Sequence, residues 1–393
     1  MDLKAREEEY FFKTYKRLDI EIARGEGCWL ISKTGERYLD LFGGLAVNSL
    51  GYNHPKINEA IRTQINKYIH LSNLFLQESQ VDLAELLIKN TGYKKIFFSN
   101  SGTEAMEGTI KLARKWGKEK GKSELIAFHG SFHGRTMGAL SITGREKYRN
   151  GYEPFLQGSI FSTYNDAQEL ISKVNQKTLA VVLEFIQGEG GINEADAQFV
   201  QTISELREKF GFLLIADEIQ SGIGRTGKFF AFNHLNIAPD VVVIAKPLGG
   251  GLPLGAFLGN ERVADVFTYG VHGTTFGGNP VACSAGIATI KEIVENGGMQ
   301  NAENIGSYLK SKFNELKLKY PNLIKDVRGR GCMLGIELKH EGESLVTEML
   351  KNKVLINCTN TNVIRLLPPL ILTKDEADFA IEQFDSIFST LNK

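Results

Sequence analysis

The stretch Val241-Val242-Val243-Ile244-Ala245-Lys246-Pro247-Leu248-Gly249-Gly250-Gly251 joins a continuously apolar run to a glycine loop, with one lysine at the junction. The apolar run predicts a short strand that is buried on both faces. A lysine at the end of such a strand is desolvated, which lowers the pKa of its amine and makes it nucleophilic. The glycines allow a flat ligand to approach the backbone closely, because they carry no Cβ atom. A lysine that is merely solvated in a loop would fit the same pattern.

A second strand end carries the complementary group. The apolar run Phe212-Leu213-Leu214-Ile215-Ala216 ends at Asp217, 29 residues before Lys246. An amine and a carboxylate at two strand ends suit pyridoxal 5'-phosphate (PLP). This cofactor binds a lysine covalently through its aldehyde, and it needs a carboxylate that keeps its ring nitrogen protonated so that the ring withdraws electrons. Asp217 could instead be a helix N-cap, but its pairing with Lys246 favours the cofactor interpretation.

Composition and charge narrow the class of protein. A chain of 393 residues is long enough for two domains, and its 46 basic residues equal its 46 acidic ones. We therefore expect no nucleic acid partner. The four cysteines are scattered without CxxC spacing, which predicts reduced thiols and no metal site. The charged N-terminus and the lack of a membrane-length apolar stretch predict a cytoplasmic protein without a membrane partner.

Short apolar strands alternate with amphipathic helical segments between residues 94 and 260. The strands are expected at 96–98, 125–128, 180–183, 212–216 and 241–245, and the helices include 103–120 and 199–209. Continuously apolar strands favour a parallel sheet with helices on both faces. After residue 285 the pattern is helical and then mixed, with strands near 333–338 and 363–366. We predict a large α/β domain at 45–285 and a small α+β domain built from 1–44 and 286–393.

Two further motifs lie at or near strand ends. Ser99-Asn100-Ser101-Gly102-Thr103-Glu104 follows one strand and opens a helix, so its free backbone N–H groups could bind a phosphate. Ser101 and Glu104 could equally form a capping box, and the two interpretations are compatible. The segment Gly222-Ile223-Gly224-Arg225-Thr226-Gly227 matches a nucleotide-binding pattern. However, Phe229 stands where a P-loop needs Ser or Thr, and residues 217–220 separate the glycines from the strand.

Seven motifs, in this order, resemble the class III (ω-amino-acid) PLP-dependent aminotransferases along essentially the whole chain. They are Asn100-Ser101-Gly102-Thr103-Glu104-Ala105, Phe132-His133-Gly134-Arg135-Thr136, Ile186-Gln187-Gly188-Glu189-Gly190-Gly191, Asp217-Glu218-Ile219-Gln220, Lys246, His272-Gly273-Thr274-Thr275-Phe276-Gly277-Gly278-Asn279-Pro280 and Arg365-Leu366-Leu367-Pro368-Pro369. The resemblance implies the fold type I of PLP-dependent transferases, which is aspartate aminotransferase-like, with a large mostly parallel-sheet domain and a small α+β domain.

The resemblance also implies a role for each cofactor residue. Lys246 binds the cofactor and moves the reacting proton, and Asp217 pairs with the ring nitrogen. The remaining cofactor-binding residues implied are Ser101, Gly102, Thr103, Phe132, Glu218, Ile219, Gln220 and Thr275. Thr275 would reach the phosphate of the partner subunit, which makes a homodimer the expected active unit. His133 is expected to have a structural role.

Among the implied substrate residues, Arg365 binds the α-carboxylate of glutamate and Arg135 the distal carboxylate, with Thr274 assisting. Glu189 would pair with Arg365 when the amine donor is bound and swing away for glutamate; a permanent salt bridge is the alternative. Leu45 stands where similar ornithine enzymes have a tyrosine.

The reaction implied moves the terminal amino group of N2-acetyl-L-ornithine to 2-oxoglutarate and gives N-acetyl-L-glutamate 5-semialdehyde and L-glutamate, a step of arginine biosynthesis. Ornithine, succinylornithine, 4-aminobutyrate or a lysine-pathway amine are alternative donors, and a PLP-binding protein without turnover is an alternative of another class. Two residues depart from the family pattern: Phe185 replaces a usual proline, and Pro247 replaces a usual alanine or glycine. Both concern loop geometry and leave the reactive side chains in place.

Overall fold

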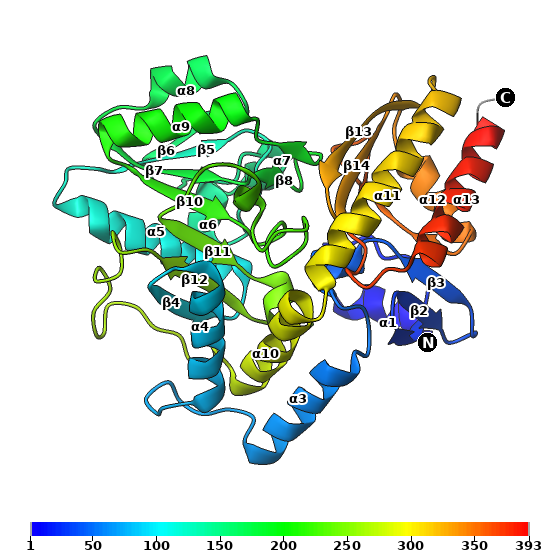
Figure 1. Cartoon of the computed structure of the whole chain (residues 1–393), viewed down its shortest axis with the longest axis horizontal. Coiled ribbons are helices and arrows are strands. Elements are labelled where there is room, and N and C mark those ends of the chain that lie inside the picture. Colours follow the sequence, from blue (N-terminus) through cyan, green and yellow to red (C-terminus); the bar gives the residue numbers. More distant parts are fainter. Residues whose placement is uncertain (1, 392–393) are drawn as a thin grey trace.

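A seven-stranded sheet forms the centre of the larger part of the protein in the computed structural model, which describes residues 2–391 (Figure 1). Six strands are parallel, and β12 runs antiparallel between β11 and β4. In sheet order the strands are β4 (Lys95–Ser99), β12 (Gly255–Gly259), β11 (Val241–Ile244), β10 (Leu213–Asp217), β7 (Thr178–Leu183), β5 (Glu124–Phe128) and β6 (Ser159–Ser162).

All five strands predicted between residues 94 and 260 are confirmed, but the sequence patterns missed β6 and β12. β12 follows β11 after a loop of ten residues, which is too short for the crossover that a parallel neighbour requires. The chain therefore reverses direction and pairs antiparallel. β6 lies at the edge of the sheet, where its mixed Ser-Ile-Phe-Ser sequence is only partly buried.

The central strands are apolar throughout because both faces of the sheet are covered. On β10, Leu214 and Ala216 pack into the core on the side of α9, whereas Leu213 and Ile215 pack on the side of α5. The longer helices of this part are α3 (Pro55–Lys67), α4 (Glu78–Thr91), α5 (Gly102–Lys118), α8 (Ala167–Lys173), α9 (Ala197–Phe210) and α10 (Pro280–Glu295). Its short elements are α2 (Gly43–Ala46), α6 (Met137–Ser141), α7 (Glu146–Arg149), the 3₁₀ helices η1 (Ala231–His234) and η2 (Lys246–Gly249), and the hairpin β8 (Ile186–Gln187) and β9 (Asn193–Glu194).

The two chain ends meet in a smaller part beside the large sheet (Figure 1). One antiparallel sheet has the order β13 (Ile324–Arg330), β14 (Met333–Leu338), β17 (Val363–Leu366) and β16 (Asn357–Thr359), next to α11 (Gly298–Lys319), α12 (Glu343–Lys351) and α13 (Lys374–Leu391). The other joins β1 (Ile22–Glu26), β2 (Trp29–Ser32) and β3 (Arg37–Asp40) to β15 (Val354–Leu355), and α1 (Leu3–Tyr10) precedes it.

The β3–β15 pairing ties the N-terminal strands to the C-terminal region. The fold class predicted from the sequence is confirmed, because a large mostly parallel sheet lies beside a smaller α+β part. The domain limits at residues 44/45 and 285/286 stay a prediction. Within residues 2–391, no helix is both long and apolar enough to cross a membrane.

Candidate functional site

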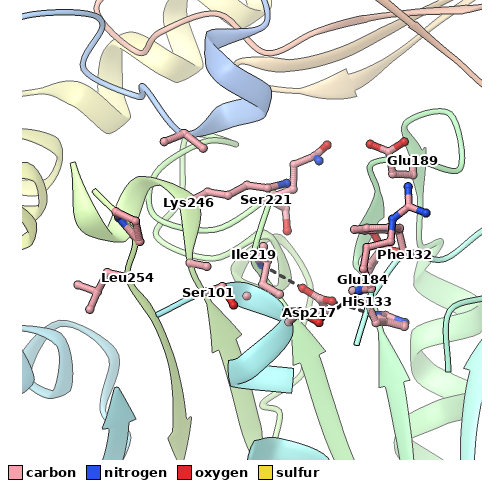
Figure 2. A pocket seen from close by; sticks show the side chains of 18 of the residues that line it. Ser101, Phe132, His133, Glu184, Glu189, Asp217, Ile219, Ser221, Lys246 and Leu254 are labelled. Atoms are coloured by element: carbon pink, nitrogen blue, oxygen red, sulfur yellow. Dashed lines mark hydrogen bonds and ion pairs between the residues drawn. The ribbon is translucent and has the colours of Figure 1, made fainter. Parts of the chain in front are cut away.

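A cavity of about 460 Å³ opens at the carboxyl ends of β10 and β11 (Figure 2). Ten of the residues predicted to bind cofactor or substrate line it: Ser101, Gly102, Thr103, Phe132, Arg135, Glu189, Asp217, Ile219, Gln220 and Lys246. They lie at the ends of β4, β5, β8, β10 and β11 or in the loops that follow these strands. The sheet therefore assembles them by the general rule that ligands bind beyond the carboxyl ends of parallel strands.

Lys246 stands directly after β11, with its backbone in the left-handed region at φ +48°. This conformation costs energy for a residue with a side chain, and such strain gathers at functional sites. The residue is half-buried, because it borders the cavity on one side and protein on the others. Burial lowers the pKa of its amine to about 8, and the positive charge of Arg365 acts in the same direction. A useful fraction of the amine is therefore neutral and nucleophilic near neutral pH.

Asp217 is held from two sides. One carboxylate oxygen lies 2.7 Å from His133 Nδ1, and the other accepts a hydrogen bond from the Ile219 amide at 3.1 Å (Figure 2). Burial alone would lower the pKa of His133, but the hydrogen bond and charge of Asp217 outweigh it and raise the pKa. His133 thus stabilises a negatively charged Asp217 that faces the cavity, which makes its role one of positioning.

Glu184 lies in the same buried cluster, directly after β7. Its carboxylate accepts hydrogen bonds from the backbone amides of Phe132 at 3.1 Å and Gly188 at 3.3 Å. Burial raises the pKa of Glu184 to about 7, and the charge of Asp217 adds to the effect. Glu184 is a site residue that was not predicted from the sequence, although it follows a buried strand in the same way as Asp217.

The start of α5 can serve both as a helix cap and as a phosphate site. Ser101 is the N-cap and accepts a hydrogen bond from the Glu104 amide at 3.3 Å, while Glu104 accepts one from the Asn100 amide at 2.6 Å. The amides of Gly102 and Thr103 belong to the first turn, which has no acceptors within the helix. A side chain at Gly102 would meet Ile219 at 2.8 Å, so only glycine leaves this approach open. The helix start is capped and can still bind a phosphate.

Arg365 on β17 is fully buried beside the cavity. It donates hydrogen bonds to Glu189 Oε1 at 2.6 Å, to Asn357 Oδ1 at 2.9 Å and to Gln220 Oε1 at 3.3 Å. Burial would raise the pKa of Glu189, but Arg365 outweighs it and the pKa is lowered. Glu189 is therefore a carboxylate that neutralises Arg365.

Arg135 and Phe132 form another wall. Phe132 is half-buried and presents a ring to the cavity, and Arg135 is exposed, with its guanidinium 5.6 Å from that ring and 3.9 Å from the ring of Tyr148. An arginine stacked on aromatic rings keeps its planar donors free for a carboxylate.

Five predicted site residues are not among those that line the cavity, and Arg365, described above, is one of them. The carboxylate of Glu218 accepts hydrogen bonds from the Ser221 hydroxyl and from two amides of η1, which is a structural arrangement. Leu45 is 40% exposed, with φ +61° at a kink in α2. Thr274 Oγ1 accepts a hydrogen bond at 3.4 Å from the side chain of Asn100, which does line the cavity. Thr275 is exposed.

The two departures from the family pattern fit their surroundings. Phe185 is buried, with its ring 5.8 Å from that of Phe232, so the larger side chain fills space under the loop. Pro247 occupies the first turn of η2, where its missing N–H is no loss.

The residues present fit PLP. A buried amine of lowered pKa, a fixed carboxylate, free helix amides and an aromatic face are the groups that its aldehyde, ring nitrogen, phosphate and ring require. The sheet topology and this set of groups define a PLP-dependent transferase of fold type I.

Comparison with known proteins gives the family. Residues 10–388 match the family described as Aminotransferase class-III, and the chain belongs to it. An acetylornithine aminotransferase of Aquifex aeolicus (strain VF5) is 45% identical over 376 residues, which cover 95% of this chain and 98% of that protein. An acetylornithine aminotransferase of Archaeoglobus fulgidus is 43% identical over 382 residues, covering 97% and 99% of the two chains.

Solved structures agree on the fold. The ornithine aminotransferase from Toxoplasma gondii ME49 superposes with a TM-score of 0.94 at 29% identity and covers 99% of this chain and 94% of its own. The acetylornithine aminotransferase from Elizabethkingia anophelis has a TM-score of 0.88 at 30% identity, with 98% of each chain covered. The resemblance predicted from the seven motifs is confirmed, and the chain is a transaminase of this family.

Proposed function

We propose that the protein transfers the terminal amino group of N2-acetyl-L-ornithine to 2-oxoglutarate, with PLP as the amino carrier, as a step of arginine biosynthesis in the cytoplasm. The products are N-acetyl-L-glutamate 5-semialdehyde and L-glutamate. The observation that carries the proposal is the full-length similarity to acetylornithine aminotransferases at 43–45% identity. The Arg365–Glu189 pair beside Lys246 supplies the geometry that this pair of substrates needs.

PLP would be held by the amides of Gly102 and Thr103 at its phosphate, by Asp217 at its ring nitrogen and by Phe132 on its ring face. Bound there, PLP supplies an electron sink for the carbanion that forms when the substrate loses a proton from the carbon bearing its amino group. The Asp217 carboxylate, oriented by His133, would keep the proton on the ring nitrogen. Lys246 Nζ, with its lowered pKa, accepts and returns the proton of the reacting carbon.

The two substrates differ in charge next to the reacting amine. Glutamate carries a carboxylate there and a second one at its far end, so it needs both Arg365 and Arg135. Acetylornithine has methylene groups next to its terminal amine and one carboxylate, which Arg135 would bind. Arg365 would then be a buried cation without a substrate partner, which is costly. Glu189 supplies the missing anion in that half-reaction and must leave Arg365 in the other.

A homodimer is part of the proposal. Leu74, Leu76 and Phe276 are 92%, 97% and 60% exposed, which is unusual for side chains of this size. Asn73 donates hydrogen bonds to the carbonyls of Thr274 and Gly277, so these apolar residues belong to segments that lie together near the exposed Thr275. A second copy would cover this surface and receive Thr275 at its phosphate site. Sedimentation should show a dimer. Thr275→Ala should weaken PLP binding but leave the dimer intact.

Free ornithine is the second candidate donor, because the ornithine aminotransferase from Toxoplasma gondii superposes so closely. Leu45 argues for the acylated donor, since an apolar side chain offers no hydrogen bond to a free α-amine. Leu45 lies two residues from Val47, which lines the cavity, and its contribution to selectivity stays a prediction.

A panel of amine donors with 2-oxoglutarate as acceptor tests the proposal. It should contain acetylornithine, ornithine, succinylornithine, 4-aminobutyrate and a lysine-pathway amine. We expect kcat/KM for acetylornithine to exceed that for ornithine at least tenfold, and Leu45→Tyr to narrow the gap. Comparable values for the two donors in the wild type would overturn the assignment of substrate. A holoenzyme that converts none of the amines in a half-reaction would instead be a binding protein.

A further inference from the structure

The carboxylate of Glu189 lies between two arginines. Its Oε1 is 2.6 Å from Arg365 Nη1, and its Oε2 is 3.8 Å from Arg145 Nη1. The side chain of Arg145 is 9% exposed and that of Arg365 is 2% exposed, so both cations are largely desolvated. Figure 2 shows Glu189 on a loop above Phe132, at the edge of the cavity.

When Glu189 leaves Arg365 so that glutamate can bind there, the Glu189 carboxylate loses its partner. A half-buried Glu189 that simply left Arg365 would be a carboxylate without a partner, in an environment that already disfavours its charged form. The cost of that unpaired charge would be subtracted from the affinity for glutamate. A second cation within reach of Glu189 removes this cost.

We propose that Arg145 is a positioning residue that holds the Glu189 carboxylate while Arg365 binds the α-carboxylate of glutamate or 2-oxoglutarate. The inference rests on the proposed function, because it requires Glu189 to leave Arg365. With glutamate bound, two cations then face two anions, in the pairs Arg365–substrate and Arg145–Glu189. With acetylornithine bound, Glu189 returns to Arg365.

The backbone around Glu189 restricts the change to its side chain. The Glu189 carbonyl accepts hydrogen bonds from Arg145 Nη1 and from Thr359 Oγ1, the latter at 2.8 Å. These bonds anchor the main chain in either state. A charge-assisted hydrogen bond is about 2.8 Å long, so Glu189 Oε2 needs to approach Arg145 by only about 1 Å. A small rotation of the Glu189 side chain is therefore sufficient to pair it with Arg145, and the substrate carboxylate would displace its other oxygen from Arg365.

The positive charge of Arg145 is available to Glu189. Within residues 2–391, Glu189 is the only carboxylate within salt-bridge distance of Arg145. Its guanidinium lies 5.4 Å from the ring of Tyr148, whose other arginine neighbour, at 3.9 Å, is Arg135. While the Glu189 carboxylate is paired with Arg365, the Tyr148 ring, the Glu189 carbonyl and Thr359 keep the Arg145 guanidinium in place.

Binding of unreactive ligands to the holoenzyme tests the proposal by calorimetry, independently of turnover. Glutarate has two carboxylates and should require Glu189 to move, whereas pentanoate has one and should not. We expect Arg145→Gln to raise the Kd for glutarate about tenfold and to leave that for pentanoate unchanged. In stopped-flow half-reactions, the same variant should impair glutamate more than acetylornithine. An equal change for both ligands would overturn the role of Arg145.

Three variants separate this role from simpler effects. Lys147→Gln removes one charge from α7, which begins directly after Arg145; Lys147 also lies near the Tyr148 ring, at 4.9 Å, but forms no salt bridge with Glu189. Thr359→Val removes the other anchor of the Glu189 carbonyl. Neither should reproduce the selective loss of glutarate affinity. Arg145→Lys keeps the charge and should retain most of the affinity for glutarate. This variant also tests the role of the charge if Arg145→Gln does not fold.

The double variant distinguishes this inference from the proposed function. Glu189→Gln should strengthen glutarate binding because Arg365 is no longer occupied, and adding Arg145→Gln should then have no further effect. If Glu189→Gln leaves the glutarate-to-pentanoate preference unchanged, the movement of Glu189 itself is wrong. If Glu189→Gln changes that preference but Arg145→Gln does not, only the role of Arg145 is refuted.

Discussion

Replacing Lys246 by methionine should stabilise the cofactor-free protein at neutral pH, in a manner that depends on pH. The amine has a pKa of about 8 in the folded chain and 10.5 when unperturbed. Between these values the unfolded chain binds more protons than the folded one, so stability rises with pH. Lys246 therefore lowers the free energy of unfolding by its full amount below pH 8, and this destabilisation is lost as the pH approaches 10.5. A difference of 2.5 pKa units corresponds to about 3 kcal/mol, and water in the cavity reduces this to roughly 1–3 kcal/mol.

Urea denaturation of wild type and Lys246→Met measures the difference directly. Both cofactor-free proteins should be unfolded at pH 6.5, 7.5, 8.5 and 9.5, at one protomer concentration because a dimer's stability depends on it. Fluorescence of Trp29 and Trp116 follows the transition. We expect the variant to be more stable at pH 6.5 and 7.5, and the difference in the free energy of unfolding between the two proteins to be much smaller at pH 9.5. A gap that does not change with pH, or a wild type more stable than the variant at pH 6.5, would refute a desolvated Lys246.

Three further predictions concern the chemistry. Borohydride reduction of the holoenzyme should attach PLP to Lys246 alone, as mapped by mass spectrometry, and a label on Lys228 would show that the assignment is wrong. Asp217→Asn should slow proton abstraction in the amino-donor half-reaction about 10- to 100-fold, because a charge-assisted hydrogen bond contributes about 1.5–3 kcal/mol; near-normal abstraction would remove this role. In stopped flow, Arg365→Ala should damage the glutamate half-reaction far more than the acetylornithine half-reaction, and Glu189→Ala should do the opposite. Equal damage in both halves would mean a static salt bridge.

The reactive centre could be predicted because it follows from strand ends. Lys246, Asp217 and the Ser101–Thr103 turn each follow an apolar run that periodicity identifies, and parallel strands deliver their carboxyl ends to one edge. Glu184 obeys the same rule, but its position carries no separate chemical signal until the structure shows it beside His133 and Asp217.

Contacts between distant loops could not be predicted in this way. Arg145 stands 44 positions from Glu189, in a segment whose charged and polar sequence is typical of a solvated surface. Its burial depends on how the loop before α7 packs against the hairpin β8–β9 and against β16, and no local pattern encodes that packing. The direction of β12 is a similar case, since it depends on loop length rather than on apolar pattern.

The arrangement of charges around Lys246 explains how one amine can serve two unlike substrates. Arg365 lowers the pKa of Lys246, and Glu189 raises it. If Glu189 left Arg365 and nothing replaced it, the field at the amine would change between the half-reactions. In the proposed exchange, Arg365 always has one anion next to it, either Glu189 or the substrate carboxylate, while Arg145 takes the charge of Glu189 away from the centre. The pKa of Lys246, and with it the reactivity of the amine, should then be similar in both directions of a reversible reaction.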